Sequence, residues 1–429
     1  MSDGRSRPRA LVLALNALTH DRRVLNEARS LAEAGFEVIR VGLVVVEGQP
    51  EQETTDFDTI IRLKPSWYKP LPAGAAGRAH DDSGARIQGV LRQWPLKVRA
   101  MNFVRDTFPR TMQGLDGLRG VHRWSKELVA LCAGLRPDVV IACDFDTLSA
   151  GAALRRRGAS FLVYDAHELW VDQSGRRFTR LVRRLALFLE SRFARQADLC
   201  TTVGNGLADT LAKRHRIPRP LVVFNGPETV MDPAPHAVGP LRLYFQGSYS
   251  PGRGIERALA AMESLRGQAT LTLQGFGVLE DELRSVAEER GLVPDPVTFV
   301  PSCRPDEVTQ AASAYDIGLV SVEPVCLNNI LSMPNKVFTY LGGGLAIMTT
   351  DETPEIAALV REYGCGIVAD KWTADAIVEA LRPLLGDRER VESMRAASRR
   401  ACDVFAWERQ FGPVVEALRE RFGQRLDAP

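Results

Sequence analysis

Two short stretches in the second half of the chain combine glycine, proline and cations in a pattern that suits anion binding. The first is Gly247–Gly254 (GSYSPGRG), between a predicted strand and a predicted helix, Glu256–Leu265. Glycine lets backbone N–H groups approach a ligand, and the start of a helix favours phosphate oxygens. Arg253 adds a guanidinium that can hold two of those oxygens at once. The loop matches neither GxxxxGK[ST] nor GxGxxG, so by itself it is a weak signal.

The second stretch, Ser332–Thr350 (SMPNKVFTYLGGGLAIMTT), is predicted to be a helix followed by a strand. We expect Ser332 to be the N-cap and Pro334 to lie in the first turn, which leaves free N–H groups beside Lys336. A lysine at this position is unfavourable against the helix dipole. It therefore indicates an anionic ligand, with an ordinary surface lysine as the alternative. Two helix starts together with Arg253 and Lys336 suit a diphosphate, and this combination is more specific than either stretch alone.

Three polar segments in the first half of the chain follow predicted strands. They are Asn16–Arg23, which contains His20 and Asp21, then Cys143–Asp146 and Tyr164–Glu168. The first segment has no glycine-rich turn, which argues against a dinucleotide-dependent oxidoreductase. A capping or salt-bridge role is the simpler interpretation for each residue alone. As a group, three polar strand ends in one sheet predict a binding site at the carboxyl edge of that sheet.

Short apolar runs alternate with longer helical patterns, such as the helix predicted over Arg23–Ala34 and ended by Gly35. This alternation predicts the α/β class, with two doubly wound, Rossmann-like domains. The strands predicted for the first domain are Leu11–Leu15, Phe36–Val46, Asp138–Cys143, Phe161–Tyr164, Asp198–Val203 and Leu221–Phe224. Those predicted for the second are Leu241–Gln246, Thr270–Gln274, Val297–Val300, Ile317–Val322, Leu345–Thr349 and Gly366–Ala369.

A proline-rich segment, 226–240, suits a linker between the two domains. We therefore predict domains at 1–228 and 229–403, followed by a C-terminal part, 404–429, that contains an amphipathic helix over Phe405–Phe422. Ligands of such folds bind at the carboxyl ends of the strands, so a cleft between the domains is the expected site.

The composition is that of a globular protein, with 429 residues of which 45% are hydrophobic and 25% charged. The net charge of +2 gives no bulk attraction to nucleic acid, and no nucleic-acid partner is expected. The seven cysteines are scattered without a CxxC pair, so free thiols are expected rather than disulfides, and no metal site is predicted. The first apolar run is interpreted as a strand and not a signal peptide, and no apolar stretch is long enough to span a bilayer. A cytoplasmic location is expected.

Two basic segments stand apart from the alternation. Residues 64–126 are predicted to be an irregular insertion, basic and aromatic over Arg86–Lys126. In the second segment, 176–195, a helix is predicted to place apolar residues on one face and arginines opposite. The apolar set is Phe178, Leu181, Val182, Leu185, Leu189 and Phe193. Each segment has two interpretations: peripheral contact with an anionic membrane surface or a lipid-phosphate acceptor, or a core-facing element with a solvated basic face.

Motifs along almost the whole chain, apart from about residues 64–126, resemble the retaining glycosyltransferases of family 4. In the second half they are GSYSPGRGIERALAAM, YDIGLVSVEP and SMPNKVFTYLGGGLAIMTTDETPEI. In the first half they are DRRVLNEARSLAEAGFEVIRV, DFDTLSAGAALRRRGASFLVYDAHELW and ADLCTTVGNGLADTL. The resemblance implies the GT-B architecture with a C-terminal helix that crosses back to the first domain. It also implies a nucleotide-sugar donor and a metal-independent transfer with retention of configuration, with no cofactor beyond that co-substrate.

The resemblance also implies roles for individual residues. Those expected at the donor diphosphate are Gly252, Arg253, Asn335 and Lys336. Those expected at the nucleotide and its ribose are Gly275, Phe276, Val300, Ser302 and Thr339. The expected catalytic residues, which orient the sugar or the acceptor, are Asp144, His167 and Glu168. Because their loop follows the first strand of the same sheet, Asn16, His20 and Asp21 are expected on the acceptor or sugar side.

The chain departs from the family pattern at three positions. Leu331 and Thr339 occupy the places of two glutamates that the family often has eight positions apart, and Cys143 stands where many relatives have histidine. A Thr339 hydroxyl would bond a ribose more weakly than a carboxylate would. Glu323, further upstream, would replace a missing glutamate only if its loop folds back.

In a front-face retaining transfer the leaving phosphate takes the acceptor proton, so no dedicated protein base is expected. The acceptor is left open among a glycan, a lipid-linked molecule and a small molecule. Two alternatives remain: a nucleotide-sugar epimerase of the same two-domain layout, and a catalytically silent sugar-nucleotide-binding relative.

Overall fold

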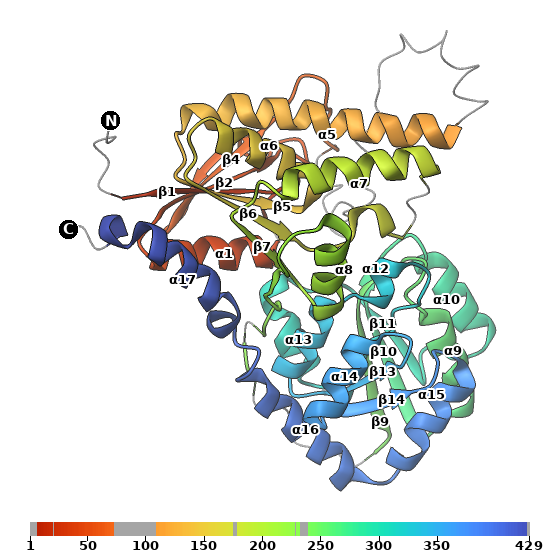
Figure 1. Cartoon of the computed structure of the whole chain (residues 1–429). Helices are drawn as coiled ribbons and strands as arrows, with labels where there is room; N and C mark the ends of the chain where they lie inside the picture. The colour runs from red at the N-terminus through yellow and green to blue at the C-terminus, as the bar shows by residue number, and fades with distance from the viewer. Residues whose placement is uncertain are drawn as a thin grey trace. The chain divides into compact units, whose positions relative to one another are not determined.

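The structure is a computed structural model of the chain and describes residues 7–19, 21–72, 109–174, 178–227, 229–231 and 239–426. The chain forms two compact units (Figure 1). Unit 1 comprises Met1–Val223 and Phe411–Pro429, and unit 2 comprises Phe224–Gln410.

Unit 1 is built on an eight-stranded sheet in which only the edge strand β3 runs antiparallel to its neighbour. From one edge to the other the strands are β3 (Gln52–Thr54), β4 (Asp58–Leu63), β2 (Glu37–Leu43), β1 (Arg9–Leu13), β5 (Val139–Cys143), β6 (Phe161–Ala166), β7 (Leu199–Thr202) and β8 (Leu221–Val222). The central strands are buried almost throughout, which is why they read as continuous apolar runs in the sequence.

Helices cover both faces of this sheet, with α1 on one side and α5 and α6 on the other (Figure 1). Among the described residues of this unit the helices are α1 (Arg22–Glu33), α5 (Pro109–Gly134), α6 (Asp144–Arg156), α7 (Arg180–Ala194) and α8 (Asn205–His215). The last helix of the chain, α17 (Trp407–Leu426), packs on this unit through its second half. The ring of Phe422 lies 5.9 Å from that of Phe36, and Arg425 pairs with Asp138 at 2.6 Å.

Unit 2 contains a six-stranded, wholly parallel sheet. Its strands in spatial order are β11 (Val297–Val300), β10 (Ala269–Phe276), β9 (Leu241–Ser248), β12 (Ile317–Leu319), β13 (Ala346–Thr350) and β14 (Gly366–Ala369). The helices are α9 (Ile255–Ser264), α10 (Glu280–Glu289), α11 (Val308–Ala312), α12 (Leu327–Ile330), α13 (Asn335–Gly342), α14 (Pro354–Tyr363), α15 (Ala374–Leu381) and α16 (Arg388–Cys402). Alternate residues of β9 enter two separate cores: Leu243 and Phe245 pack on one face and Tyr244 on the other.

The predicted fold class is confirmed, including the C-terminal helix that returns to the first part of the chain. The seven cysteines are all free thiols. None of the helices in the described part of the chain is both long and apolar enough to cross a membrane.

The predicted irregular insertion, 64–126, is wrong at its end. Helix α5 begins at Pro109 and buries Trp124, Leu128 and Cys132, so its basic residues are the outer side of a core helix. Strands β3 and β4 were also not predicted. Residues 73–108, and residues 228 and 232–238 of the predicted linker, lie outside the described residues.

Candidate functional site

Three neighbouring strands bring the polar segments of unit 1 to one edge of the sheet. Strands β1, β5 and β6 are adjacent and parallel, so their carboxyl ends meet. The segments that start at Ala14, Asp144 and His167 therefore emerge together, as predicted from the sequence.

The centre of this edge is a buried ion pair between helix α1 and strand β6. Arg23 donates from Nε and Nη2 to the two oxygens of Asp165, at 2.7 and 2.6 Å, and from Nη1 to the backbone oxygen of Val223 at 2.7 Å. The hydroxyl of Thr201 donates to the same carboxylate at 2.6 Å. Although burial raises the pKa of Asp165, Arg23 and His167 outweigh it and hold the pKa well below the usual value.

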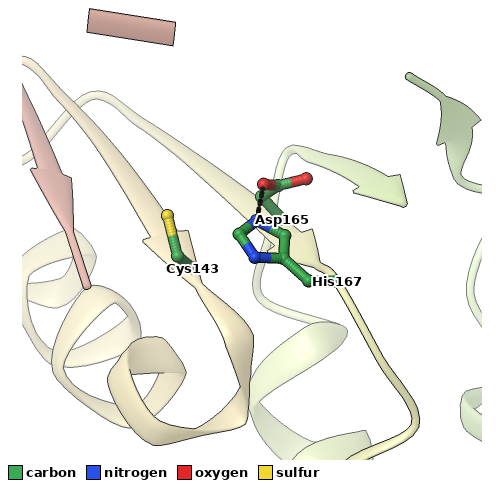
Figure 2. A group of neighbouring side chains, drawn as sticks. All are labelled: Cys143, Asp165 and His167. Atoms are coloured by element: carbon green, nitrogen blue, oxygen red, sulfur yellow. Dashed lines mark hydrogen bonds and ion pairs between the residues drawn. The ribbon is translucent and has the colours of Figure 1, made fainter. Parts of the chain in front are cut away.

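His167 is clamped between two carboxylates. Its Nε2 donates to Asp165 (Figure 2), and its Nδ1 lies 3.6 Å from Oδ2 of Asp144. Burial by itself would lower the pKa of His167, but the negative charges of Asp165 and Asp144 outweigh it and raise the pKa to about 10. At neutral pH the side chain is therefore an imidazolium, which donates hydrogen bonds and cannot act as a base.

Asp144 begins helix α6 with a positive φ of 60°. Its Oδ1 accepts the backbone N–H of His167 at 2.9 Å, which ties the two strand ends together. Burial raises the pKa of Asp144 to about 7, and the charge of His167 opposes that rise. A left-handed conformation at a non-glycine residue is uncommon and is concentrated at functional sites.

Cys143, Asp165 and His167 form the only group of potential metal ligands found among the described residues, with ligand atoms within 4.8 Å of one another (Figure 2). Their chemistry does not suit a metal ion. Arg23 already places a fixed cation against the carboxylate, and His167 is protonated. Burial and the neighbouring carboxylates raise the pKa of the Cys143 thiol, so the thiolate that would bind a metal is disfavoured.

The other predicted residues of this edge have simpler roles. Asn16 donates to Asp21 at 2.6 Å, and Asp21 caps helix α1 by accepting the N–H of Val24 at 3.2 Å. Both residues thus shape the loop after β1. Glu168 is half-buried beside the cluster, and His20 lies outside the described residues.

The sequence interpretation missed Arg23 and Glu27 as site residues. Both lie on α1 and are at least 96% buried, and Glu27 Oε1 is 3.4 Å from Arg23 Nε. Burial and the neighbouring Asp165 raise the pKa of Glu27 well above its usual value, which favours its protonated form. The sequence did contain a signal for these two residues. They are four positions apart and adjoin the apolar stripe of Val24 and Ala28, where a charged side chain needs a buried partner.

In unit 2 the glycine-rich loop joins β9 to α9, and the structure explains two of its glycines. Gly254 is the N-cap of α9 with φ 63°, and a Cβ there would lie 2.5 Å from the ring of Trp372, whose Nε1 donates to the Gly254 oxygen. The oxygen of Gly252 accepts the backbone N–H of Glu323 at 2.9 Å, so a second loop packs against this one.

Lys336 brings the start of α13 to the same loop. Its Nζ lies 3.5 Å from the position that a Cβ of Gly247 would occupy and 3.9 Å from the ring centroid of Phe245. The side chain is 92% buried, so the face of the aromatic ring stabilises a desolvated cation. The two cation-bearing stretches predicted from the sequence thus adjoin one another within unit 2.

Arg253 has no ion-pair or hydrogen-bond partner among the described residues and is half-buried. The neighbouring guanidinium of Arg257 differs, since it is paired with Glu323 at 3.2 Å. The loop of Glu323 does fold back to the glycine-rich loop, but this ion pair occupies its carboxylate.

The start of α13 differs in detail from the prediction. Pro334 is the N-cap, and the hydroxyl of Ser332 donates instead to the oxygen of Asn329 at 2.9 Å. The predicted N-cap is wrong because α12 precedes α13 closely, and Ser332 closes the end of α12. Asn335, at the first position of α13, accepts from Asn225 at 2.7 Å, and Thr339 is buried one turn further along.

The residues predicted to flank the nucleotide lie at the carboxyl ends of β10 and β11. Gly275 pairs with Gly247 in register, and a Cβ on Gly275 would collide with the Gly247 oxygen at 1.9 Å. Phe276 and Val300 are half-buried and Ser302 is exposed. Close packing of β9 against β10 thus explains glycine at position 275, and the nucleotide-binding role of this group stays a prediction.

Unit 1 also has an open pocket of about 440 Å³, lined by Arg7, Phe36, Thr54 and Asp58 among others. It lies where β2 and β4 begin, at the amino edge of the parallel strands. Ligands of such sheets bind at the opposite edge.

Comparison with protein families gives two matches. The family described as Glycosyl transferase 4-like domain matches residues 19–227, and the family described as Glycosyl transferases group 1 matches residues 240–387. Comparison with curated protein sequences gave no significant match.

Solved structures of similar fold cover almost the whole chain at low sequence identity. Sucrose-phosphate synthase from Thermosynechococcus elongatus has a TM-score of 0.73 at 15% identity, over 97% of this chain and 100% of that one. A structure described as trehalose-6-phosphate from E. coli bound with UDP-2-fluoro glucose has 0.65 at 14%, over 96% and 98%. HepE from Anabaena, in complex with UDP and glucose, has 0.62 at 13%, over 96% and 99%.

Proposed function

Because the chain is a glycosyltransferase of the GT-B fold, with a glycosyl transferase 4-like domain followed by a glycosyl transferases group 1 domain, we propose that it transfers a sugar from a nucleoside-diphosphate sugar with retention of configuration. The observation that carries the proposal is the pair of cations at one loop of unit 2. Lys336 adjoins Gly247, and Arg253 in the same loop has no partner among the described residues. A ligand with two linked phosphates can contact both cations.

In the proposed reaction the bond from the anomeric carbon to the leaving phosphate oxygen breaks, and a bond from that carbon to an acceptor oxygen forms on the same face. The departing diphosphate gains negative charge. Arg253, Lys336 and the backbone N–H groups at the start of α9 and α13 stabilise that charge in place, without reorganisation. The acceptor hydroxyl loses its proton to the leaving phosphate, so the step balances without a protein base.

His167 is proposed to donate from Nδ1, the ring nitrogen that Asp165 does not occupy, to a hydroxyl of the sugar or the acceptor. Its imidazolium is fixed by Asp165 and Asp144, and a charged donor of this kind forms hydrogen bonds about twice as strong as a neutral one. Asp144 and Glu168 are proposed to accept from the same substrate. His167 therefore acts through position and charge rather than through proton transfer.

We propose that transfer needs no metal ion. The two cations of unit 2 supply the charge that a divalent ion gives to a diphosphate in other enzymes. A uridine diphosphate sugar is the first donor to try, since two of the similar structures contain UDP or a UDP sugar. The free thiols suit a reducing compartment, and we expect the enzyme to work in the cytoplasm.

The test is to incubate the protein with UDP-, GDP- and TDP-linked sugars without an acceptor, in the presence of EDTA. We expect one donor class to be hydrolysed slowly to free sugar and nucleoside diphosphate. The Arg253→Ala variant should lose this reaction. The matched control is Arg290→Ala, because Arg290 is an exposed arginine at the end of α10 that pairs with Glu263. Loss of hydrolysis on addition of EDTA would contradict the metal-independent step.

The two alternatives have distinct outcomes in this assay. An epimerised donor would indicate an epimerase, and binding of a donor without any turnover would indicate a silent relative. Neither alternative is favoured, since both matching families are described as glycosyl transferases.

A further inference from the structure

Helix α7 of unit 1 buries only part of the predicted apolar face: Phe178, Val182 and Leu189 pack on the core. The predicted apolar face included Leu181 and Leu185, but both are exposed. The buried side is Val182, Ala186, Glu190 and Ala194. Small side chains suit this contact because α7 packs closely on α5: a Cβ at Gly114 of α5 would lie 2.6 Å from Val182.

The outward side of α7 therefore carries an apolar stripe. Leu181 is 67% exposed, Leu185 38% and Phe188 62%. Their spacing of four and three residues places them on one face of the helix. Three of the eight large exposed hydrophobic side chains among the described residues lie on this single helix, a clustering that marks an interaction surface.

Arginines share that side of the helix. Arg184 and Arg192 are exposed and fall within the same angular sector as Leu181 and Phe188. The one acidic residue of α7, Glu190, is buried on the opposite side, where it accepts a hydrogen bond from Tyr164 at 2.9 Å. The exposed surface of α7 is thus apolar and positively charged, with no carboxylate of its own.

We propose that this α7 surface, formed by Leu181, Arg184, Leu185, Phe188 and Arg192, docks on an anionic lipid bilayer. A lipid bilayer supplies a partner for each part of this helix surface: acyl chains for the apolar stripe and lipid phosphates for the arginines. A second copy of the chain meeting α7 about a two-fold axis would instead set arginine against arginine. The proposal concerns where the enzyme works and does not depend on which sugar it transfers.

The experiment is co-sedimentation of the full-length protein with vesicles of phosphatidylcholine, with and without phosphatidylglycerol. We expect binding to the anionic vesicles only, with weaker binding as salt rises. The double variants Leu181→Ser/Phe188→Ser and Arg184→Gln/Arg192→Gln should each bind at least about tenfold more weakly. Thermal unfolding and acceptor-free donor hydrolysis should match wild type in both variants, so that failure of docking is separable from failure of the proposed chemistry.

Matched controls are Val404→Ser, an exposed valine of unit 2, and Arg419→Gln/Arg421→Gln on the exposed side of α17. Both should bind vesicles as wild type does. The proposal is overturned if wild type ignores anionic vesicles, if it binds neutral ones equally, or if the α7 variants bind unchanged. A wild-type dimer that the leucine and phenylalanine changes dissociate would assign the surface to a second copy instead.

Discussion

The carboxyl edges of the two sheets handle charge in opposite ways. In unit 1 the charges are buried and satisfied internally, since Asp165 receives Arg23, His167 and Thr201. In unit 2 the edge is cationic and incomplete, because Arg253 has no partner among the described residues.

This difference separates positioning from binding. A buried ion pair fixes geometry at a high desolvation cost and is strongly destabilising when one partner is removed. A partly exposed cation without a partner contributes little to folding and is available to a ligand. Substitutions at the first edge should therefore change stability, and those at the second should change donor affinity.

The largest expected effect is from Asp165→Asn. It removes the bidentate carboxylate partner of the buried Arg23 and frees His167, so the free energy of unfolding should fall by about 3–5 kcal/mol. Urea denaturation measures it. The control is Asp209→Asn, at an exposed pair with Arg219, where the loss should stay below about 1 kcal/mol. Equal losses at Asp165 and Asp209 would show that the buried ion pair stabilises the fold no more than an exposed one.

Arg253→Ala should show the reverse pattern. Loss of a charge-assisted contact to the donor diphosphate is worth about 1.5–3 kcal/mol, or roughly 10- to 100-fold in the donor Kd. The unfolding free energy should change by less than about 0.5 kcal/mol. Isothermal titration with the donor identified by the hydrolysis assay measures the affinity. An unchanged Kd would show that Arg253 is an ordinary surface residue.

The pH dependence of stability should report the clamp on His167. Its pKa is raised from an unfolded value of 6.5 to about 10, so its stabilisation is present in full below pH 6.5 and is lost as pH rises through about 10. Between pH 7 and pH 8 the wild type should lose about 1–2 kcal/mol more than His167→Gln. The measurement is the free energy of unfolding as a function of pH for both proteins. Subtracting one curve from the other removes the contribution of titratable groups that the two proteins share. Parallel curves would mean that His167 is neutral in the folded protein.

The smallest expected effect is from Thr339→Val in unit 2. If the hydroxyl bonds the ribose, its loss should weaken donor binding by about 0.5–1.5 kcal/mol, or roughly 2- to 12-fold. Thr309→Val, at another buried threonine of the same unit, should leave binding unchanged. A donor Kd that is the same in both variants would remove Thr339 from the proposed site.

Much of the fold followed from local pattern. The apolar runs of β1, β5 and β9 are continuous because both faces of each strand are covered, and this periodicity is visible in the sequence. Strand β4 was missed because it alternates buried and half-buried residues and includes two charged side chains, Asp58 and Arg62, that are themselves buried. The guanidinium of Arg62 donates hydrogen bonds to the backbone oxygens of Ala17 and Pro50. No local sequence pattern predicts these contacts.

Helix α7 shows a different limit. Its sequence, RLVRRLALFLESRFA, is apolar around more than half of its circumference. Two apolar faces were therefore nearly equivalent by periodicity. Only the close approach of Gly114 on α5, which admits the smaller Val182 and Ala186, decides which face is buried.

The sequence by itself determined the α/β class, the two sheets, the polar strand ends and the two cation-bearing stretches, because each depends on residues close together in the chain. The tertiary structure decided which of them meet. Arg23 reaches Asp165 across 142 residues because strand order places β1, β5 and β6 side by side. Lys336 reaches Gly247 because α13 begins at the carboxyl edge of the sheet, beside the end of β9. Such pairings follow from long-range packing, which minimises buried charge without a partner and is not encoded in any one segment.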